Sequence, residues 1–165
     1  TYGPGSALLA IRRGGQEVIW SDDRASRIKR MQTHWNTPIY HDGHIYGSSG
    51  RHHHNAELRC ISADSGEVRW SQLGLYRSSL LYVDGHFICL SEDGTLRLIK
   101  VNAEKYEPIA DVLIKHEGQQ LLEYPAWAAP ILSHGLLYVR GKEYLVCLEL
   151  IGEVKGVGES KGRGG

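Results

Sequence analysis

The chain has 165 residues, of which 41% are hydrophobic and 23% charged, a composition typical of a globular domain long enough to bury a sizeable core. Nineteen basic and nineteen acidic residues give a formal net charge of zero, which argues against nucleic acid or an anionic membrane surface as the partner. No apolar run approaches the ~20 residues of a membrane span, so we expect no direct membrane insertion.

The chain opens with two short strand-like segments and carries almost no helical pattern. Residues 8–11 and 17–20 are predicted strands, separated by a turn at Gly14 and Gly15. They correspond to the last two strands of a repeat that begins earlier. Residues 22–34 follow as an insertion between repeats.

One complete repeat is predicted over residues 37–71. Its strands fall at residues 38–40, 44–47, 58–63 and 67–70. A turn at His41-Asp42-Gly43 joins the first two strands, a loop over residues 48–55 follows, and a turn at residues 64–66 joins the last two. Four antiparallel strands in sequence form one blade of a β-propeller.

Two further repeats keep the same frame. Strands are expected at residues 80–82, 86–90 and 95–99, with residues 106–113 as a fourth strand that lacks the expected Trp. After a second insertion at residues 114–126, the third repeat places strands at residues 129–132, 136–139 and 144–150. We therefore assign residues 1–151 to the repeats. Residues 152–165 form a Gly-rich tail that we expect to be flexible, because so few bulky side chains cannot offset its ordering entropy.

Self-similarity supports this frame. Trp35, Pro38, Ile39, Gly43 and Tyr46 recur 92 positions later as Trp127, Pro130, Ile131, Gly135 and Tyr138. Glu17, Val18, Trp20 and Ser21 recur 50 positions later as Glu67, Val68, Trp70 and Ser71, and at the same offset Ala10 corresponds to Cys60. Repetition at 40–50 residues is typical of propellers and solenoids. We therefore predict an all-β fold, a partial β-propeller with about three and a half four-stranded antiparallel blades of a seven- or eight-bladed ring.

The segment from Ala63 to Trp70 resembles the tryptophan-docking signature of PQQ-like, or quinoprotein-type, propellers. In that signature a Ser or Thr precedes a Gly, and a Trp follows the Gly by four residues, as Gly66 and Trp70 do here. The resemblance covers about residues 7–150. Independently of it, Gly66 gives the turn its backbone freedom and Asp64 can accept hydrogen bonds from turn amides. Trp70, and Trp20 one blade earlier, can wedge between blades while the indole N–H meets a carbonyl.

An open arc of blades leaves sheet edges and apolar faces uncovered. We therefore expect the remaining blades to come from the same longer chain or, as the less favoured option, from a second copy. By family resemblance we expect an extracytoplasmic location, periplasmic or exported; no signal segment is visible in the chain.

Three residues are predicted to share one position at the start of the innermost strands. Counting back eight residues from Gly43, Gly85 and Gly135 gives Trp35, Arg77 and Trp127, with Asn36 and Ser78 beside them. Two aromatic rings and a guanidinium around a channel suit a planar or anionic ligand, or a peptide. The alternative is that both tryptophans only pack loops against the blades.

No metal site is predicted. The cluster Arg51-His52-His53-His54-Asn55 falls on a loop without further ligands, and Asp22-Asp23 and Glu92-Asp93 are explained by turn chemistry. Cys60, Cys89 and Cys147 lie in apolar strands and are expected to be small buried hydrophobic residues.

Two functions follow from the resemblance. The favoured one is a non-catalytic binding or assembly scaffold for protein or ligand partners, like the BamB-type propellers that dock partners of outer-membrane protein assembly; it needs no cofactor. The alternative is a fragment of a quinoprotein alcohol or sugar dehydrogenase, which would use PQQ and Ca²⁺. The adjacent cysteine pair common in those enzymes is absent here, and no catalytic residue can be assigned.

Overall fold

The structure, a computed structural model, describes residues 3–150. The described part is all-β, with a single 3-10 turn, η1 (His53–Asn55). No helix in it is long and apolar enough to cross a membrane. The tail expected at residues 152–165, and the domain limit at residue 151, lie outside the described residues.

Two four-stranded antiparallel sheets form the centre of the molecule. The first contains β3 (Ile39–His41), β4 (His44–Ser49), β5 (Glu57–Ser62) and β6 (Val68–Leu73), and the second contains β7 (Ser78–Val83), β8 (His86–Ser91), β9 (Thr95–Lys100) and β10 (Glu107–Leu113). In both sheets each strand pairs with the next one in sequence. The prediction of an all-β chain with four-stranded antiparallel sheets is confirmed.

Smaller sheets flank this central pair. β1 (Ala7–Arg12) pairs with β2 (Gly15–Ser21), and β13 (Ile131–Ser133), β14 (Leu136–Arg140) and β15 (Leu145–Glu149) form a three-stranded sheet. The insertion at residues 114–126 contains a short hairpin of β11 (Lys115–His116) and β12 (Gln119–Gln120), which the sequence did not predict. None of these sheets closes on itself.

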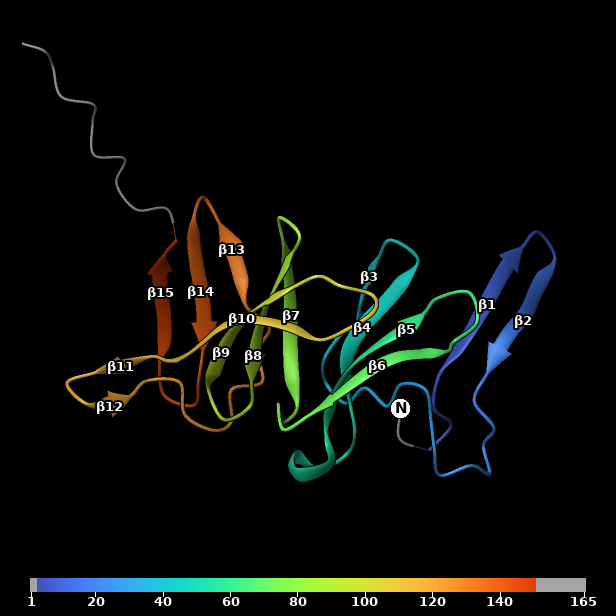
Figure 1. The fold of residues 1–165 in the computed structure, drawn as a ribbon, viewed down its shortest axis with the longest axis horizontal. Coiled ribbons are helices and arrows are strands. Elements are labelled where there is room, and N and C mark those ends of the chain that lie inside the picture. Colours follow the sequence, from blue (N-terminus) through green and yellow to red (C-terminus); the bar gives the residue numbers. More distant parts are fainter. Residues whose placement is uncertain (1–2, 151–165) are drawn as a thin grey trace, which may run out of the picture.

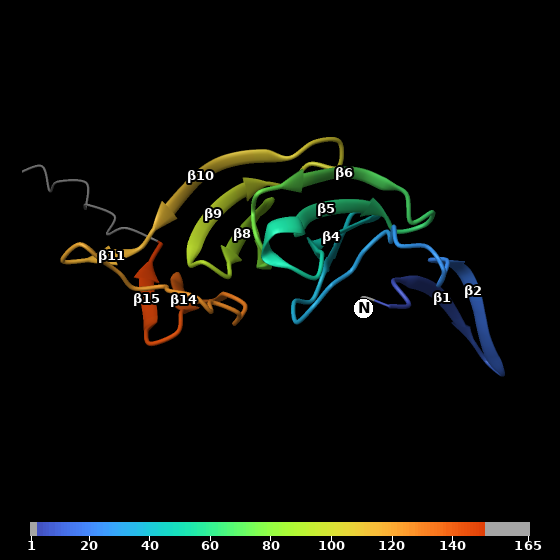
Figure 2. The same cartoon turned by 90° about the horizontal axis from the view of Figure 1, so that it is seen from below.

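The sheets stand side by side in a curved row, with β6 and β10 on its convex side (Figures 1 and 2). Tight turns at Asp42-Gly43, Asp84-Gly85 and His134-Gly135 lie along one side of the row, at the top of Figure 1, and every residue in these turns has positive φ. The long connections between sheets lie along the opposite side, at the bottom of Figure 1, which we call the loop end. Short turns at one end and long loops at the other follow from the meander within each sheet.

The hydrophobic core lies between the sheets. One cluster fills the space between β3–β6 and β7–β10, and a second fills the space between β7–β10 and β13–β15; the largest members are Tyr46, Phe87, Leu58, Leu90 and Leu137. Cys60 and Cys89 are buried as expected, and burial raises the pKa of Cys60 to about 11. The expectation for Cys147 is wrong, because β15 is the outer strand of its sheet and leaves this thiol exposed.

Two tryptophans join consecutive sheets in the same way. Trp20 Nε1, on β2, donates to the carbonyl oxygen of Ala63 at 2.8 Å, and Trp70 Nε1, on β6, donates to that of Asn102 at 2.9 Å. Each carbonyl lies in the turn between the last two strands of the next sheet. A tryptophan whose apolar ring packs between two sheets, and whose N–H donates to a carbonyl of the second sheet, can hold the two sheets in register.

The turn that receives Trp20 depends on a glycine. Gly66 has φ +70°, and a Cβ there would lie 2.9 Å from the Trp20 ring and 2.6 Å from Arg30 Cδ. The turn amides are bound by two serines and not by Asp64, which is exposed: Ser65 N donates to Ser62 Oγ, and Glu67 N to Ser65 Oγ. The role expected for Asp64 is therefore taken by Ser62 and Ser65, whose hydroxyl oxygens accept these hydrogen bonds.

Candidate functional site

Trp35, Arg77 and Trp127 converge at the loop end, each on the connection that precedes the first strand of its sheet. The centroids of the two indole rings are 5.1 Å apart, and the planes are inclined by 42°. The Arg77 guanidinium lies over the Trp35 ring, 4.6 Å from its centroid, which is a cation–π distance. Residues 92 positions apart in the sequence thus share one cluster.

Glu92 completes this cluster, and sequence analysis assigned it only to a turn. Its carboxylate accepts hydrogen bonds from Arg77 Nε at 3.0 and 3.1 Å and from Arg77 Nη2 at 2.6 Å. Trp127 Nε1 lies 3.3 Å from the same carboxylate. The Glu92 side chain is 1% exposed, so the ion pair is held away from solvent. Hydrogen bonds to Glu92 raise the pKa of Arg77.

This ion pair changes which ligand the cluster suits. A buried charge requires a partner, and here each charge is the partner of the other. The cluster therefore presents little net charge, and Arg77 positions Trp35 and Trp127 more than it attracts an anion. Trp127 is 45% exposed and offers an aromatic face to a partner.

Asn36 and Ser78 lie behind the cluster and not on its surface. Asn36 is 8% exposed; its Nδ2 donates to the Ser48 carbonyl and its Oδ1 accepts from the His34 amide. Ser78 is 1% exposed at the start of β7. Asn36 bonds to β4 and Ser78 is buried at the start of β7, so both residues fix the connections that carry Trp35 and Arg77.

Two concave regions border the cluster. One, of about 350 Å³, is lined by His53, Tyr76, Glu92, Asp93 and Tyr124. The other, of about 200 Å³, is lined mainly by the loop from Pro125 to Ala128 and by residues 140–142. Trp127 lies between them, with Tyr124 edge-on to its ring at 6.0 Å. The aromatic cluster is thus the centre of a hollowed surface.

The loop over residues 120–126 forms the floor of this surface. Ala126 N donates to the Glu92 carbonyl at 3.0 Å, and Gln120 Nε2 donates to the Asp93 carbonyl at 2.7 Å. Leu122 is fully buried against Gly94, where a Cβ would lie 1.3 Å from the Leu122 carbonyl oxygen. The loop can pack this closely only because residue 94 has no side chain.

His34 introduces a titratable group beside the aromatic rings. Its imidazole lies edge-on to Trp35 at 4.9 Å. Burial, and then the positive charge of Arg77, lower the pKa of His34 below its usual value of 6.5. Neutral imidazole is therefore favoured at the loop end.

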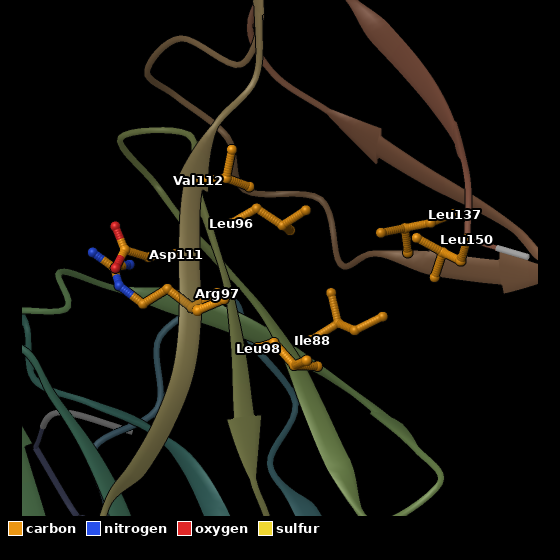
Figure 3. Close-up of a pocket in the computed structure, with 9 residues that line it drawn as sticks. Ile88, Leu96, Arg97, Leu98, Asp111, Val112, Leu137 and Leu150 are labelled. Carbon is orange, nitrogen blue, oxygen red and sulfur yellow. The ribbon is translucent and has the colours of Figure 1, made fainter. Parts of the chain in front are cut away.

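A different cavity lies between β7–β10 and β13–β15, at the position where the third docking tryptophan would be expected. It measures about 240 Å³ and has an apolar lining that includes Ile88, Leu96, Leu98, Val112, Leu137 and Leu150 (Figure 3). Ala110 also lines it and pairs with Leu98, as Trp70 pairs with Cys60 one sheet earlier. Substitution of the repeat's Trp by Ala accounts for the cavity.

Among residues 3–150, no group of three or more His, Cys, Asp or Glu side chains is placed to hold a metal ion. His52 and His54 stack with ring centroids 5.5 Å apart on the exposed η1 turn. No protein-family model matches the chain, and the comparison with curated proteins gives no match.

Proposed function

We propose that the chain forms consecutive blades of a PQQ-like β-propeller and acts as a non-catalytic binding or assembly scaffold, with its binding surface at the loop end. The observation that carries this proposal is the convergence of Trp35, Arg77 and Trp127 from three equivalent connections onto one hollowed surface. A partner that contacts this surface would touch three consecutive sheets at once.

The repeated geometry supports the propeller. Two four-stranded meanders stand face to face in a curved row, and Trp20 and Trp70 make the same bond to the following sheet. The family assignment rests on the resemblance of residues 63–70 to the docking signature, and BamB-like scaffolds are the members that need only a rigid ring and surface loops. The open edges of β1 and β15 can pair with further strands, from a longer chain or from a second copy, that complete their sheets.

The chemistry of the cluster favours a protein partner. Trp127 is half exposed, and interface hot spots are enriched in Trp, Tyr and Arg. Trp35 Nε1 is buried without an acceptor among the described residues, and a carbonyl of the partner would supply one. The low net charge of the Arg77–Glu92 pair suits an apolar or aromatic side chain of the partner.

No specific observation favours the quinoprotein dehydrogenase. The described residues do not fit its calcium ion, because no cluster of ligands is present and the carboxylates of Glu92 and Asp93 are engaged by Arg77 and Thr95. We therefore assign no step to PQQ. An extracytoplasmic location follows from the family resemblance and is part of the same proposal.

Site-specific photo-crosslinking tests the binding surface. A photoreactive phenylalanine replaces Trp127 in the full-length protein expressed in its own cells, and the matched control replaces Tyr40, an aromatic residue 68% exposed beside the turn at the opposite end. We expect a discrete protein adduct at position 127 and none at position 40. Equal labelling at both positions would contradict the proposal, as would a quinone absorbance change on adding PQQ and calcium.

A further inference from the structure

A further concave region at the loop end is lined by positively charged residues. It measures about 420 Å³, and its basic lining residues are Arg24, Arg27, Lys29, Arg51 and His52. No Asp or Glu of the described chain lines it. Since the whole chain has a formal net charge of zero, such a concentration of cations in one hollow is not a consequence of composition.

The cations of this hollow differ from their neighbours in how the charge is balanced. Arg30, Arg59 and Arg77 each pair with a carboxylate, at 3.1, 2.8 and 2.6 Å respectively. Within residues 3–150, no ion pair joins Arg24, Arg27 or Lys29 to an acidic side chain. The charges of Arg24, Arg27 and Lys29 are therefore not neutralised by an ion pair, and low-dielectric walls concentrate their field.

Lys29 makes the hollow more than a surface patch. This residue is 4% exposed, and its ammonium group donates to the backbone carbonyls of Asp23 and Arg24. A buried ammonium carries three donors and is expensive to bury without an anion. Asp23 lines a neighbouring hollow together with Lys29, but its carboxylate accepts from the Ala25 amide and forms no ion pair with the Lys29 ammonium in the described structure.

The walls of the hollow are also held in place by bonds that do not use the charged groups of Arg24 and Arg27. Asp22 accepts hydrogen bonds from the amides of Ser6 and Arg30 and pairs with Arg30. Gln32 bonds to the segment before η1, its amide donating to Ser49 Oγ and its carbonyl accepting from Gly50 N. A preorganised arrangement of donors loses less entropy when it binds a ligand.

We propose that this hollow binds a small molecule carrying a multiply charged oxyanion, namely a phosphate ester. Guanidinium groups match the geometry of such oxyanions in pairs of parallel hydrogen bonds, and Arg24, Arg27 and Arg51 approach the hollow from two loops. The ester oxygens supply the charge that the Lys29 ammonium lacks. The proposal goes beyond the scaffold role and does not depend on it.

Titration of the full chain with inorganic pyrophosphate tests the charge chemistry, measured by calorimetry at 150 mM NaCl to suppress unspecific attraction. We expect one saturable site, and binding about tenfold weaker or worse in the double variant Arg24→Gln, Arg27→Gln. The matched control, Arg13→Gln with Lys105→Gln, removes two exposed charges elsewhere and should bind like the original chain.

Folding is checked separately, because Lys29 is buried and its replacement can unfold the loop. The Arg24, Arg27 variant should keep the thermal midpoint of the original chain, since both side chains lack ion pairs in the described structure. Equal weakening in the two double variants would overturn the proposal, as would the absence of saturable binding at 150 mM NaCl. Neither result would affect crosslinking at position 127.

Discussion

The two interfaces between the larger sheets are built from the same repeat but are filled differently. Between β3–β6 and β7–β10, the Trp70 ring packs on the core and its N–H bonds to Asn102. Between β7–β10 and β13–β15, Ala110 stands at the matching position and a cavity of about 240 Å³ remains. A repeat can therefore lose its docking residue without losing its strand order.

The second interface is held by a loop instead. Leu122 and Ala126, from the insertion, are buried in the core cluster between these sheets. The backbone frame is unchanged: Ala63, Val101 and Leu150 each donate an amide hydrogen bond to the hairpin Gly of the same sheet, at 2.8 to 2.9 Å. One interface is held by a tryptophan side chain and the other by a loop. The strand order within each sheet is therefore kept even where the contacts between sheets differ.

The largest effect is expected from Trp70→Ala, which removes the docking ring from the first interface. Loss of a large, mostly buried aromatic side chain should lower the free energy of unfolding by about 3–5 kcal/mol. Chemical denaturation monitored by circular dichroism measures this change. Trp70→Phe, which keeps a ring but no N–H donor, should lose less, and an unchanged midpoint for Trp70→Ala would refute the docking role.

The second interface should be broken from the loop side by Gly94→Ala. This substitution places a Cβ 1.3 Å from the Leu122 carbonyl in a backbone with φ +88°, so the loop must move away; we expect a loss of about 2–3 kcal/mol. Gly85→Ala is the control, because Gly85 has φ +75° but open space around it. It should lose only about 1 kcal/mol, and equal losses would show that loop packing contributes nothing.

Ala110→Trp should make the two interfaces more alike. The new indole would enter the apolar cavity beside Leu98 and Leu137, and we expect the unfolding free energy to rise by about 1 kcal/mol through buried apolar area. Ile109→Trp is the matched control, since Ile109 is 51% exposed and does not line the cavity. A rise in the free energy of unfolding for Ile109→Trp but not for Ala110→Trp would show that the cavity does not accommodate a tryptophan side chain.

The smallest effect concerns pH and separates the loop end from the core. His34 has a lowered pKa, so the unfolded chain binds more protons below pH 6.5, and the stabilisation present above that pH is lost as the pH falls. Burial raises the pKa of Tyr46 in the core, which therefore does not titrate in this range. The thermal midpoint should fall less between pH 7.5 and pH 5.5 in His34→Gln than in the original chain. An equal fall in both proteins would show that His34 does not contribute to the acid response.

Much of the architecture could be predicted from residue patterns alone. The hairpin glycines and the alternating apolar residues place β3 to β10 within a few residues of the observed bounds, because strand period and turn chemistry are local properties. The shared position of Trp35, Arg77 and Trp127 follows from the repeat count. Glu92 could not be found in this way, since a Glu in a turn has the same local pattern whether it is solvated or buried under an arginine.

The sequence by itself determined the strand frame, the docking tryptophans and the position of the loop-end cluster, because these depend on spacing within each repeat. Only the tertiary structure decided how charge is distributed at that end. The Arg77–Glu92 pair, the basic hollow around Lys29 and the cavity beside Ala110 are each formed by residues that lie far apart in the sequence. Burial and Coulomb energy depend on three-dimensional distance, which the chain order does not carry.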